Sequence, residues 1–173
     1  MFNLNMKSIK TNFKQNKNMI AINFMFICLF AFLDQITKNL IILFFVKNEI
    51  SLYEVLPFFN LTLVLNTGVS FGIFSGLSYG KIIISTIVLC IILVLFYLFL
   101  KEKRFLVSFC YSIIIAGAIG NTIDRIKYGG VVDFLDFHLM GFHYPAFNIA
   151  DSLVFCGAFA LIFYDLFKKK YEK

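Results

Sequence analysis

Carboxylate, amide and guanidinium side chains recur at a few places in a chain that is otherwise strongly apolar. Charged groups are costly near membrane depth and usually mark functional sites there. Two facing carboxyl groups can share a proton, so that the charged one activates a water and the neutral one donates a hydrogen bond to a carbonyl. Such a pair hydrolyses a peptide without a metal. The polar residues that could build this site are Asp34, Asn121, Asp124, Arg125, Asp133, Asn148 and Asp151.

The rest of the sequence predicts membrane helices that would position these residues. Of 173 residues, 60% are hydrophobic and 15% charged, and the mean hydropathy is +0.85, which leaves thin polar cover for a soluble domain. A spanning helix needs roughly 20 mostly apolar residues. The stretches that meet or approach this length are 19–36, 79–100, 105–118 with a small-residue continuation to 121, and 150–167. The first stretch has no small-residue cleavage site, which favours a retained helix over a signal peptide.

Basic residues predict the orientation of these helices. Eleven of the 16 Lys and Arg residues precede the first stretch, join the second to the third, or follow the fourth. Because Lys and Arg are enriched in cytoplasmic loops, we expect both termini in the cytoplasm and the two long connections outside. All the polar residues named above then reach the same outer interface. The net charge of +6 reflects this bias, and the basic residues form no stripe typical of nucleic-acid binding.

One domain is predicted, residues 19–167, preceded by a polar segment at 1–18 that we expect to be loose and followed by a basic tail at 168–173. In the first outer connection, 39–78, residues 60–65 and 69–74 are β-prone and flank a turn at 66–68. In the second, residues 131–137 form a third candidate strand. A small sheet is therefore expected on the outer face. The loop 135–146, with Gly141 as a hinge, is predicted to be a mobile lid; a fixed interfacial segment is the alternative.

Each polar residue also has a purely structural interpretation. Asn148 with Asp151 can cap a helix, and Asp124 with Arg125 can form an ion pair at a helix end. Asp34 with Lys38 can be a surface pair four residues apart, and Asp133 and Asp136 can be exposed strand positions. His138 and His143 indicate a metal only weakly, because no Cys or acidic ligand pattern accompanies them. We expect no metal and no other cofactor.

Five segments together resemble the lipoprotein signal peptidase family, also called signal peptidase II. Each alone is a weak motif, but five in order, with four spans between them, are highly specific. The resemblance covers roughly residues 20–167. The segments are DQITK at 34–38, NTGVSF at 66–71, GNTIDR at 120–125, VVDF at 131–134 and FNIADS at 147–152.

The resemblance implies an aspartic endopeptidase of the bacterial cytoplasmic membrane. It makes Asp133 and Asp151 the catalytic dyad and leaves Asp124 outside it. The supporting and substrate-binding residues that it implies are Asp34, Lys38, Asn66, Gly68, Asn121, Asp124, Arg125 and Asn148.

The implied substrate is a prolipoprotein whose lipobox Cys carries diacylglycerol, cut on the N-terminal side of that Cys. Membrane lipids are expected neighbours, and cyclic peptide inhibitors such as globomycin are expected to bind. We expect no nucleic-acid partner and a monomeric protein.

Two other classes of protein also use carboxylates in the membrane. Intramembrane aspartyl proteases carry a G-x-G-D segment, which is absent here, and usually have more spans. A non-enzymatic four-span ion or proton carrier would place its carboxylates near mid-bilayer, whereas the acids here gather at one rim. The predicted fold is an all-α membrane protein of four transmembrane helices, with a small β-sheet and a mobile loop on the outer (periplasmic) face.

Overall fold

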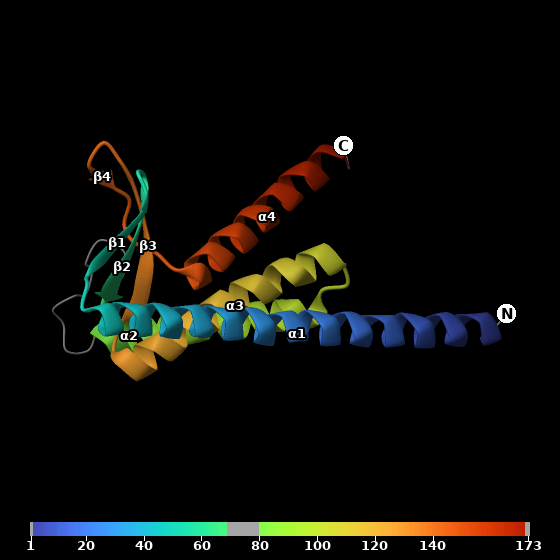
Figure 1. Ribbon diagram of the computed structural model, residues 1–173. Helices are drawn as coiled ribbons and strands as arrows, with labels where there is room; N and C mark the ends of the chain where they lie inside the picture. Colours follow the sequence, from blue (N-terminus) through green and yellow to red (C-terminus); the bar gives the residue numbers. More distant parts are fainter. Residues whose placement is uncertain (1, 69–79, 172–173) are drawn as a thin grey trace.

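The computed structural model describes residues 2–68 and 80–171, with side chains described at 17–68, 83 and 85–167. The described helices are α1 (Phe2–Asn48), α2 (Gly80–Lys101), α3 (Phe105–Tyr128) and α4 (Ile149–Tyr171). The described strands are β1 (Leu52–Leu56), β2 (Phe59–Asn66), β3 (Val131–Leu139) and β4 (Phe142–His143). The strands gather at one end of the helices, and both chain termini lie toward the other end (Figure 1).

α1 is much longer than the sequence predicted. The predicted span ended at residue 36 and was followed by a connection, but the helix continues to Asn48. Residues 39–46 contain no Gly or Pro, so no helix breaker follows Lys38. The helix also begins at Phe2, so the N-terminal segment that was expected to be loose is helical. Its last turns lie beside the sheet, where Phe44 packs edge-on against Tyr53 of β1.

α3 also passes the point at which its predicted span ended. It continues from residue 121 to Tyr128, and the following Gly129 adopts a left-handed φ of 72°. The backbone N–H of Gly129 donates a hydrogen bond to the Arg125 carbonyl, a common way to end a helix. Asn121, Asp124 and Arg125 therefore project from the last turns of a rigid helix.

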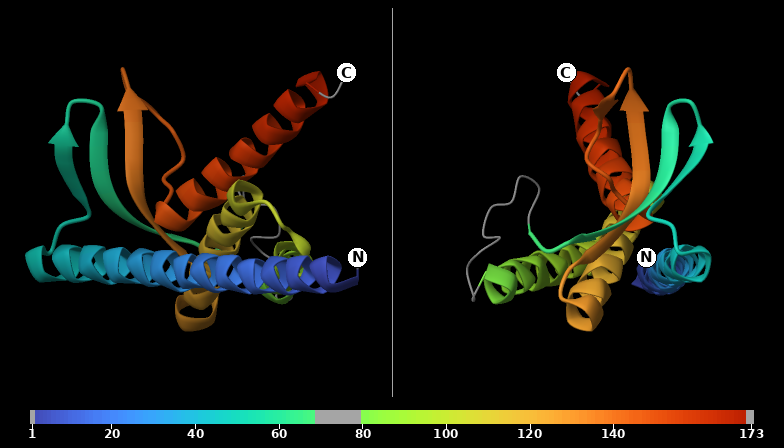
Figure 2. Two further views of the ribbon diagram at one scale, coloured as in Figure 1. Left: turned by 90° about the vertical axis from the view of Figure 1, so that its right-hand side faces the viewer. Right: turned by 60° about the vertical axis from the view of Figure 1, so that its left-hand side comes forward.

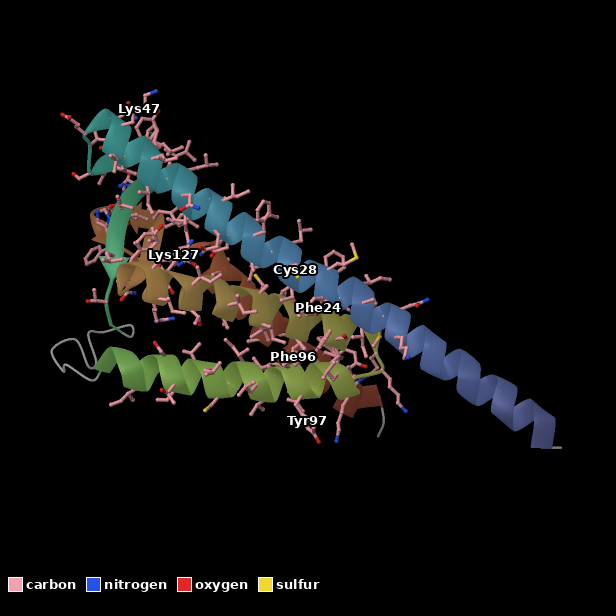
Figure 3. The ribbon with its side chains drawn as sticks, turned by 90° about the horizontal axis from the view of Figure 1, so that it is seen from below. Phe24, Cys28, Lys47, Phe96, Tyr97 and Lys127 are labelled. Carbon is pink, nitrogen blue, oxygen red and sulfur yellow. The ribbon has the colours of Figure 1, made fainter. Side chains whose placement is uncertain are left out.

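α3 is the central helix, and the other described helices pack on it. Ile27 of α1, Phe99 of α2 and Ile115 of α3 meet in a buried cluster, with Phe96 packed against it (Figure 3). α4 approaches α3 closely at two glycines. A Cβ at Gly117 would collide with the backbone of α4, and one at Gly157 would collide with side chains of α3. Small residues at such crossings are typical of helix packing in membranes.

The sheet is antiparallel in the order β1-β2-β3-β4. The strands expected at 60–65 and 131–137 are confirmed as β2 and β3, whereas β1 and β4 were not predicted. The strand expected at 69–74 lies outside the described residues. The segment 135–146, expected to be a loop, contains the end of β3, a tight turn and β4. Met140 and Gly141 have φ values of 49° and 85°, a pair of positive φ values typical of a two-residue hairpin turn.

Within the described residues, three segments are long and apolar enough to cross a membrane: Lys17–Asn48, Phe105–Tyr128 and Ile149–Phe167. A shorter apolar stretch, Ser85–Lys101, belongs to α2. A helix of 32 residues is roughly 48 Å long, against a hydrocarbon core of about 30 Å. The last turns of α1 can therefore extend beyond the hydrocarbon. Figure 2 shows that this end of α1 leads directly into the sheet. The fourth span remains a prediction.

Candidate active site

The start of α4 holds the first part of the site. Asn148 precedes the helix, and its side-chain Oδ1 accepts a hydrogen bond of 2.9 Å from the Asp151 backbone N–H. The Asp151 carboxylate accepts one of 3.2 Å from the Asn148 backbone N–H. This reciprocal pair is a capping box, so the structural interpretation of these two residues is correct. It also fixes the Asn148 amide, because an oxygen held by the helix leaves the NH₂ group directed elsewhere.

Asp133 lies on β3, where the NH₂ group of Asn148 reaches it. Asn148 Nδ2 donates to Asp133 Oδ1 at 2.7 Å, and Asn66 Nδ2, from β2, donates to Asp133 Oδ2 at 3.0 Å. The side-chain oxygen of Asn66 in turn accepts a hydrogen bond from the Gly68 backbone N–H at 3.2 Å. Asp133 and Asp151, 18 positions apart in the sequence, thus both accept hydrogen bonds from Asn148, Asp133 from its side chain and Asp151 from its backbone.

Asn121 holds the other side of Asp151. Its Nδ2 donates to Asp151 Oδ1 at 2.7 Å, while its Oδ1 accepts from Lys38 Nζ at 2.9 Å and from Asn148 Nδ2 at 3.1 Å. Lys can only donate, so Lys38 fixes which end of the Asn121 amide faces Asp151. The amide orientations therefore follow from one cation and one helix cap.

Beneath this layer, Lys38 bridges two buried carboxylates. Its Nζ lies 2.9 Å from Asp34 and 2.8 Å from Asp124, and all three side chains are at most 1% exposed. Asp34 also accepts the Ala150 N–H of α4 at 2.9 Å, and Asp124 accepts the Val132 N–H of β3 at 3.1 Å. The surface-pair interpretation of Asp34 and Lys38 is therefore wrong. The cluster joins α1, α3, α4 and β3.

Gln35 belongs to this cluster, although the sequence analysis does not include it among the candidate site residues. Its Nε2 donates to Asp124 Oδ1 at 2.8 Å and to the Gly120 carbonyl at 3.1 Å, and Lys127 donates to its oxygen at 3.3 Å (Figure 3). A side chain at Gly120 would collide with the Asp34 carboxylate. Gln35 follows Asp34 in the DQITK segment, and its place in that segment is the signal that could have identified it.

Arg125 and Gly68 lie at the edge of the cluster. The half-buried Arg125 donates to the Asn121 backbone carbonyl at 3.4 Å. It forms no ion pair with the described residues, so the interpretation as a partner of Asp124 is wrong. Gly68 donates its backbone N–H to the Asn66 side chain at 3.2 Å.

Asp133 has an unusual electrostatic environment. Its side chain is 2% exposed, and burial raises its pKa from 3.8 to about 6. The hydrogen bond from Asn66 opposes this change, and the charge of Asp151 adds to it. Asp151 is more open and sits in the first turn of α4, where the positive end of the helix dipole stabilises negative charge. The two carboxyl groups therefore lie in different environments, and burial favours the neutral form of Asp133.

Asp136 is not the exposed strand residue that the sequence suggested. It is 6% exposed, accepts a hydrogen bond from Asn60 Nδ2 at 3.2 Å, and has His143 Nδ1 2.9 Å from each of its oxygens. The side chains of Asn60 on β2 and His143 on β4 thus enclose its carboxylate, which period-two alternation alone does not reveal. Among the described residues, no group of three or more His, Cys, Asp and Glu is arranged to hold a metal ion.

Helices of membrane-spanning length, with carboxylates and amides converging beneath a small sheet, define a membrane enzyme. A family model described as signal peptidase (SPase) II matches residues 26–167. A lipoprotein signal peptidase from Thermodesulfovibrio yellowstonii is 45% identical over 142 residues, 82% of this chain and 92% of that protein. A lipoprotein signal peptidase from Desulforapulum autotrophicum is 42% identical over 142 residues, which cover 79% of this chain and 86% of that protein.

A solved structure described as a bacterial membrane enzyme superposes with a TM-score of 0.72 and 31% identity, over 88% of this chain and 92% of that one. Another with the same description gives a TM-score of 0.68 at 33% identity. The chain belongs to the signal peptidase II family. It is therefore a protease, of the aspartic type that characterises this family, and a protein of the bacterial inner membrane.

Proposed function

We propose that this protein removes the signal peptide from prolipoproteins whose cysteine carries diacylglycerol, cutting on the N-terminal side of that cysteine, with Asp133 and Asp151 as the catalytic dyad. The observation that carries the proposal is their shared contact with Asn148, at 2.7 Å and 3.2 Å, in environments that differ in burial. The family and its relatives named lipoprotein signal peptidase support the substrate class.

Asp151 is the general base in this proposal. Donors from Asn121 and Asn148 and the N-terminus of α4 stabilise its negative charge. A water between the carboxyl groups gives a proton to Asp151, and its oxygen bonds to the carbonyl carbon of the scissile peptide. Neither a metal nor a covalent enzyme intermediate is needed.

Asp133 is the neutral acid. Its raised pKa of about 6 keeps the proton on Asp133 up to mildly acidic pH, and this proton passes to the carbonyl oxygen as the tetrahedral intermediate forms. When the C–N bond breaks, the proton held by Asp151 goes to the leaving nitrogen and the intermediate returns one proton to Asp133. The dyad thus regains one proton in total.

The polar residues around the dyad have two roles in the proposal. Asn66, Asn121 and Asn148 orient the carboxyl groups, and Lys38 with Asp34 and Asp124 holds those amides in place. Arg125, whose guanidinium has N–H groups left over from its contact at 3.4 Å, binds backbone carbonyls of the substrate. Gly68 stays a predicted substrate-binding residue.

The proposed topology places the sheet and the dyad on the outer face, with four spans and both termini in the cytoplasm. It rests on the basic-residue bias and on the position of both termini away from the sheet (Figure 1). A cysteine introduced at residue 102 should react with an impermeant thiol reagent only from the cytoplasmic side. Labelling from outside alone would show an inverted topology. We further propose a monomer that binds cyclic peptide inhibitors such as globomycin.

Cleavage of a lipid-modified signal-peptide substrate by the purified protein tests the function. Asp133→Asn and Asp151→Asn should each abolish cleavage while leaving the protein folded in detergent. Asp165→Asn, which removes an exposed carboxylate far along α4, is the matched control and should cleave at the normal rate. Normal cleavage by either dyad variant would refute the assignment. If neither the unaltered protein nor any variant cleaves the substrate, and vesicles that contain the unaltered protein conduct protons, the result would favour the non-enzymatic carrier.

A further inference from the structure

α4 carries a row of four phenylalanines that the site does not use. Phe155, Phe159, Phe163 and Phe167 are spaced four residues apart, and we call them the Phe ladder. Successive ring centroids are 5.8, 4.4 and 6.0 Å apart. Between 44% and 68% of each side chain is exposed. Neighbouring rings therefore lie side by side and form a continuous ridge along every fourth residue, a kind of ridge by which helices pack.

The Phe ladder lies on the side of α4 away from α3. Ala150 and Val154 of α4 lie against Gly117 of α3, and Gly157 of α4 lies against Ile113 and Ile114 of α3. Tyr164 of α4 lies under the guanidinium of Arg104, which directly precedes α3, at 5.1 Å. α4 also diverges from α1 as it runs toward the C-terminus (Figures 1 and 2). No described element covers the ladder.

The ladder is continuous with the candidate active site. Asp151 is one step of four residues before Phe155, so the carboxylate begins the same row. Asp151 is also the more open member of the dyad, while Asp133 is 2% exposed. A substrate reaching Asp151 from its open side would therefore meet the first ring of the ladder directly beyond the site.

The length and direction of the ladder fit one occupant. From Phe155 to Phe167 is roughly 18 Å along a helix. The apolar core of a signal peptide has 7–15 residues, roughly 10–22 Å if helical. This core precedes the scissile bond, so its chain runs toward the site, whereas α4 runs away from it.

We propose that the Phe ladder is the docking face for the apolar helix of the signal peptide, which lies antiparallel to α4 with its C-terminal end at Asp151. This inference rests on the proposed function and adds to it the surface that receives the substrate. Four adjacent rings offer a large apolar area that aliphatic side chains of the signal peptide can pack against. Such a surface can accept signal peptides of different sequence, because this packing requires bulky apolar side chains and not a particular hydrogen bond.

The test compares two matched double variants of the full-length protein in detergent. Phe159→Leu with Phe163→Leu alters the ladder, and Phe24→Leu with Phe32→Leu alters exposed rings of α1 (Figure 3). Leu preserves hydropathy, and the melting temperature checks that each variant folds. The ladder variant should raise KM for the lipid-modified substrate about three- to tenfold, with kcat within about twofold of the unaltered protein. The α1 variant should change neither. Unchanged KM in the ladder variant, or an equal rise in both, would overturn the inference.

Photocrosslinking identifies the occupant directly. A photoreactive phenylalanine analogue at position 159, in a protein inactivated by Asp133→Asn, should crosslink to the apolar core of the signal peptide, and the analogue at position 32 should not. Crosslinks from position 159 to lipid alone, or to a second copy of the chain, would overturn the inference. If the unaltered protein cleaves while position 159 never reaches the substrate, only the docking surface is wrong. If the unaltered protein does not cleave, the proposed function fails and the inference with it.

Discussion

The carboxyl group of Asp133 should make the stability of the folded protein depend on pH. Burial raises its pKa from 3.8 to about 6, so the folded protein holds this proton more tightly than the unfolded chain does. The stabilisation from the bound proton is fully present below pH 3.8 and is lost as the pH rises through about 6. Ionised Asp133 therefore destabilises the fold at neutral pH.

The size of this effect follows from the change in pKa. A difference of about two units corresponds to roughly 3 kcal/mol of unfolding free energy. The side chain is 2% exposed, so solvent screening reduces this value little. The Asn66 and Asn148 hydrogen bonds are already included in the raised value of about 6.

Unfolding of the purified protein in detergent, followed between about pH 4 and pH 7, measures the dependence. The Asp133→Asn variant cannot ionise at this position, so the stability lost by the unaltered protein over this range should be smaller in the variant by about 3 kcal/mol. Asp165→Asn removes an exposed carboxylate and should give a curve parallel to that of the unaltered protein. If the Asp133→Asn curve is also parallel, Asp133 does not hold its proton as argued.

Four further results are expected. Cleavage should decline as the pH rises through and beyond about 6, since the dyad then loses the proton that Asp133 donates; a flat profile up to strongly alkaline pH would contradict this role. Lys38→Met leaves two buried carboxylates unpaired and should cost about 3–5 kcal/mol of stability along with most activity, so a normal melting temperature would count against the cluster. Asp136→Asn should lower stability by about 1–3 kcal/mol yet leave cleavage nearly unchanged; loss of cleavage in a folded variant would show a direct role. Spin labels at residues 140 and 66 should report a distance that shifts when a peptide inhibitor binds, and one narrow, unchanged distance would remove the lid.

The lid prediction now concerns a hairpin and not an irregular loop. Its tip is highly exposed, with Met140 at 92% and Phe142 at 85%, while its base is held by the contact of His143 with Asp136. Any movement should therefore bend the tip about the Met140–Gly141 turn and leave β3 in place. The end of β3 that carries Asp133 would stay fixed while the tip adapts to different signal peptides.

The position of a helix was predictable from the sequence where the helix coincides with an uninterrupted apolar run. α2 begins and ends within one residue of the predicted stretch, and α4 begins one residue early. The ends of α1 and α3 were not predictable from hydropathy, because Asp34, Lys38 and Asn121 lower it without breaking the helix. Their polar side chains are satisfied by one another across helices, and a hydropathy pattern along one chain cannot show such pairing.

The sequence by itself determined that polar residues from distant segments would reach one end of a helical membrane protein, since apolar runs and basic flanks set that arrangement. It also suggested the capping box at Asn148 and Asp151, which is local. Only the tertiary structure decided the rest. Asp124 and Asp133 are both acids next to the same interface, yet Asp124 is bound by Lys38 and Gln35 while Asp133 is bound by amides alone. Whether a carboxylate is paired with a cation or only with neutral donors depends on which segment packs against it. These contacts join residues far apart in the chain, so the sequence pattern does not show them.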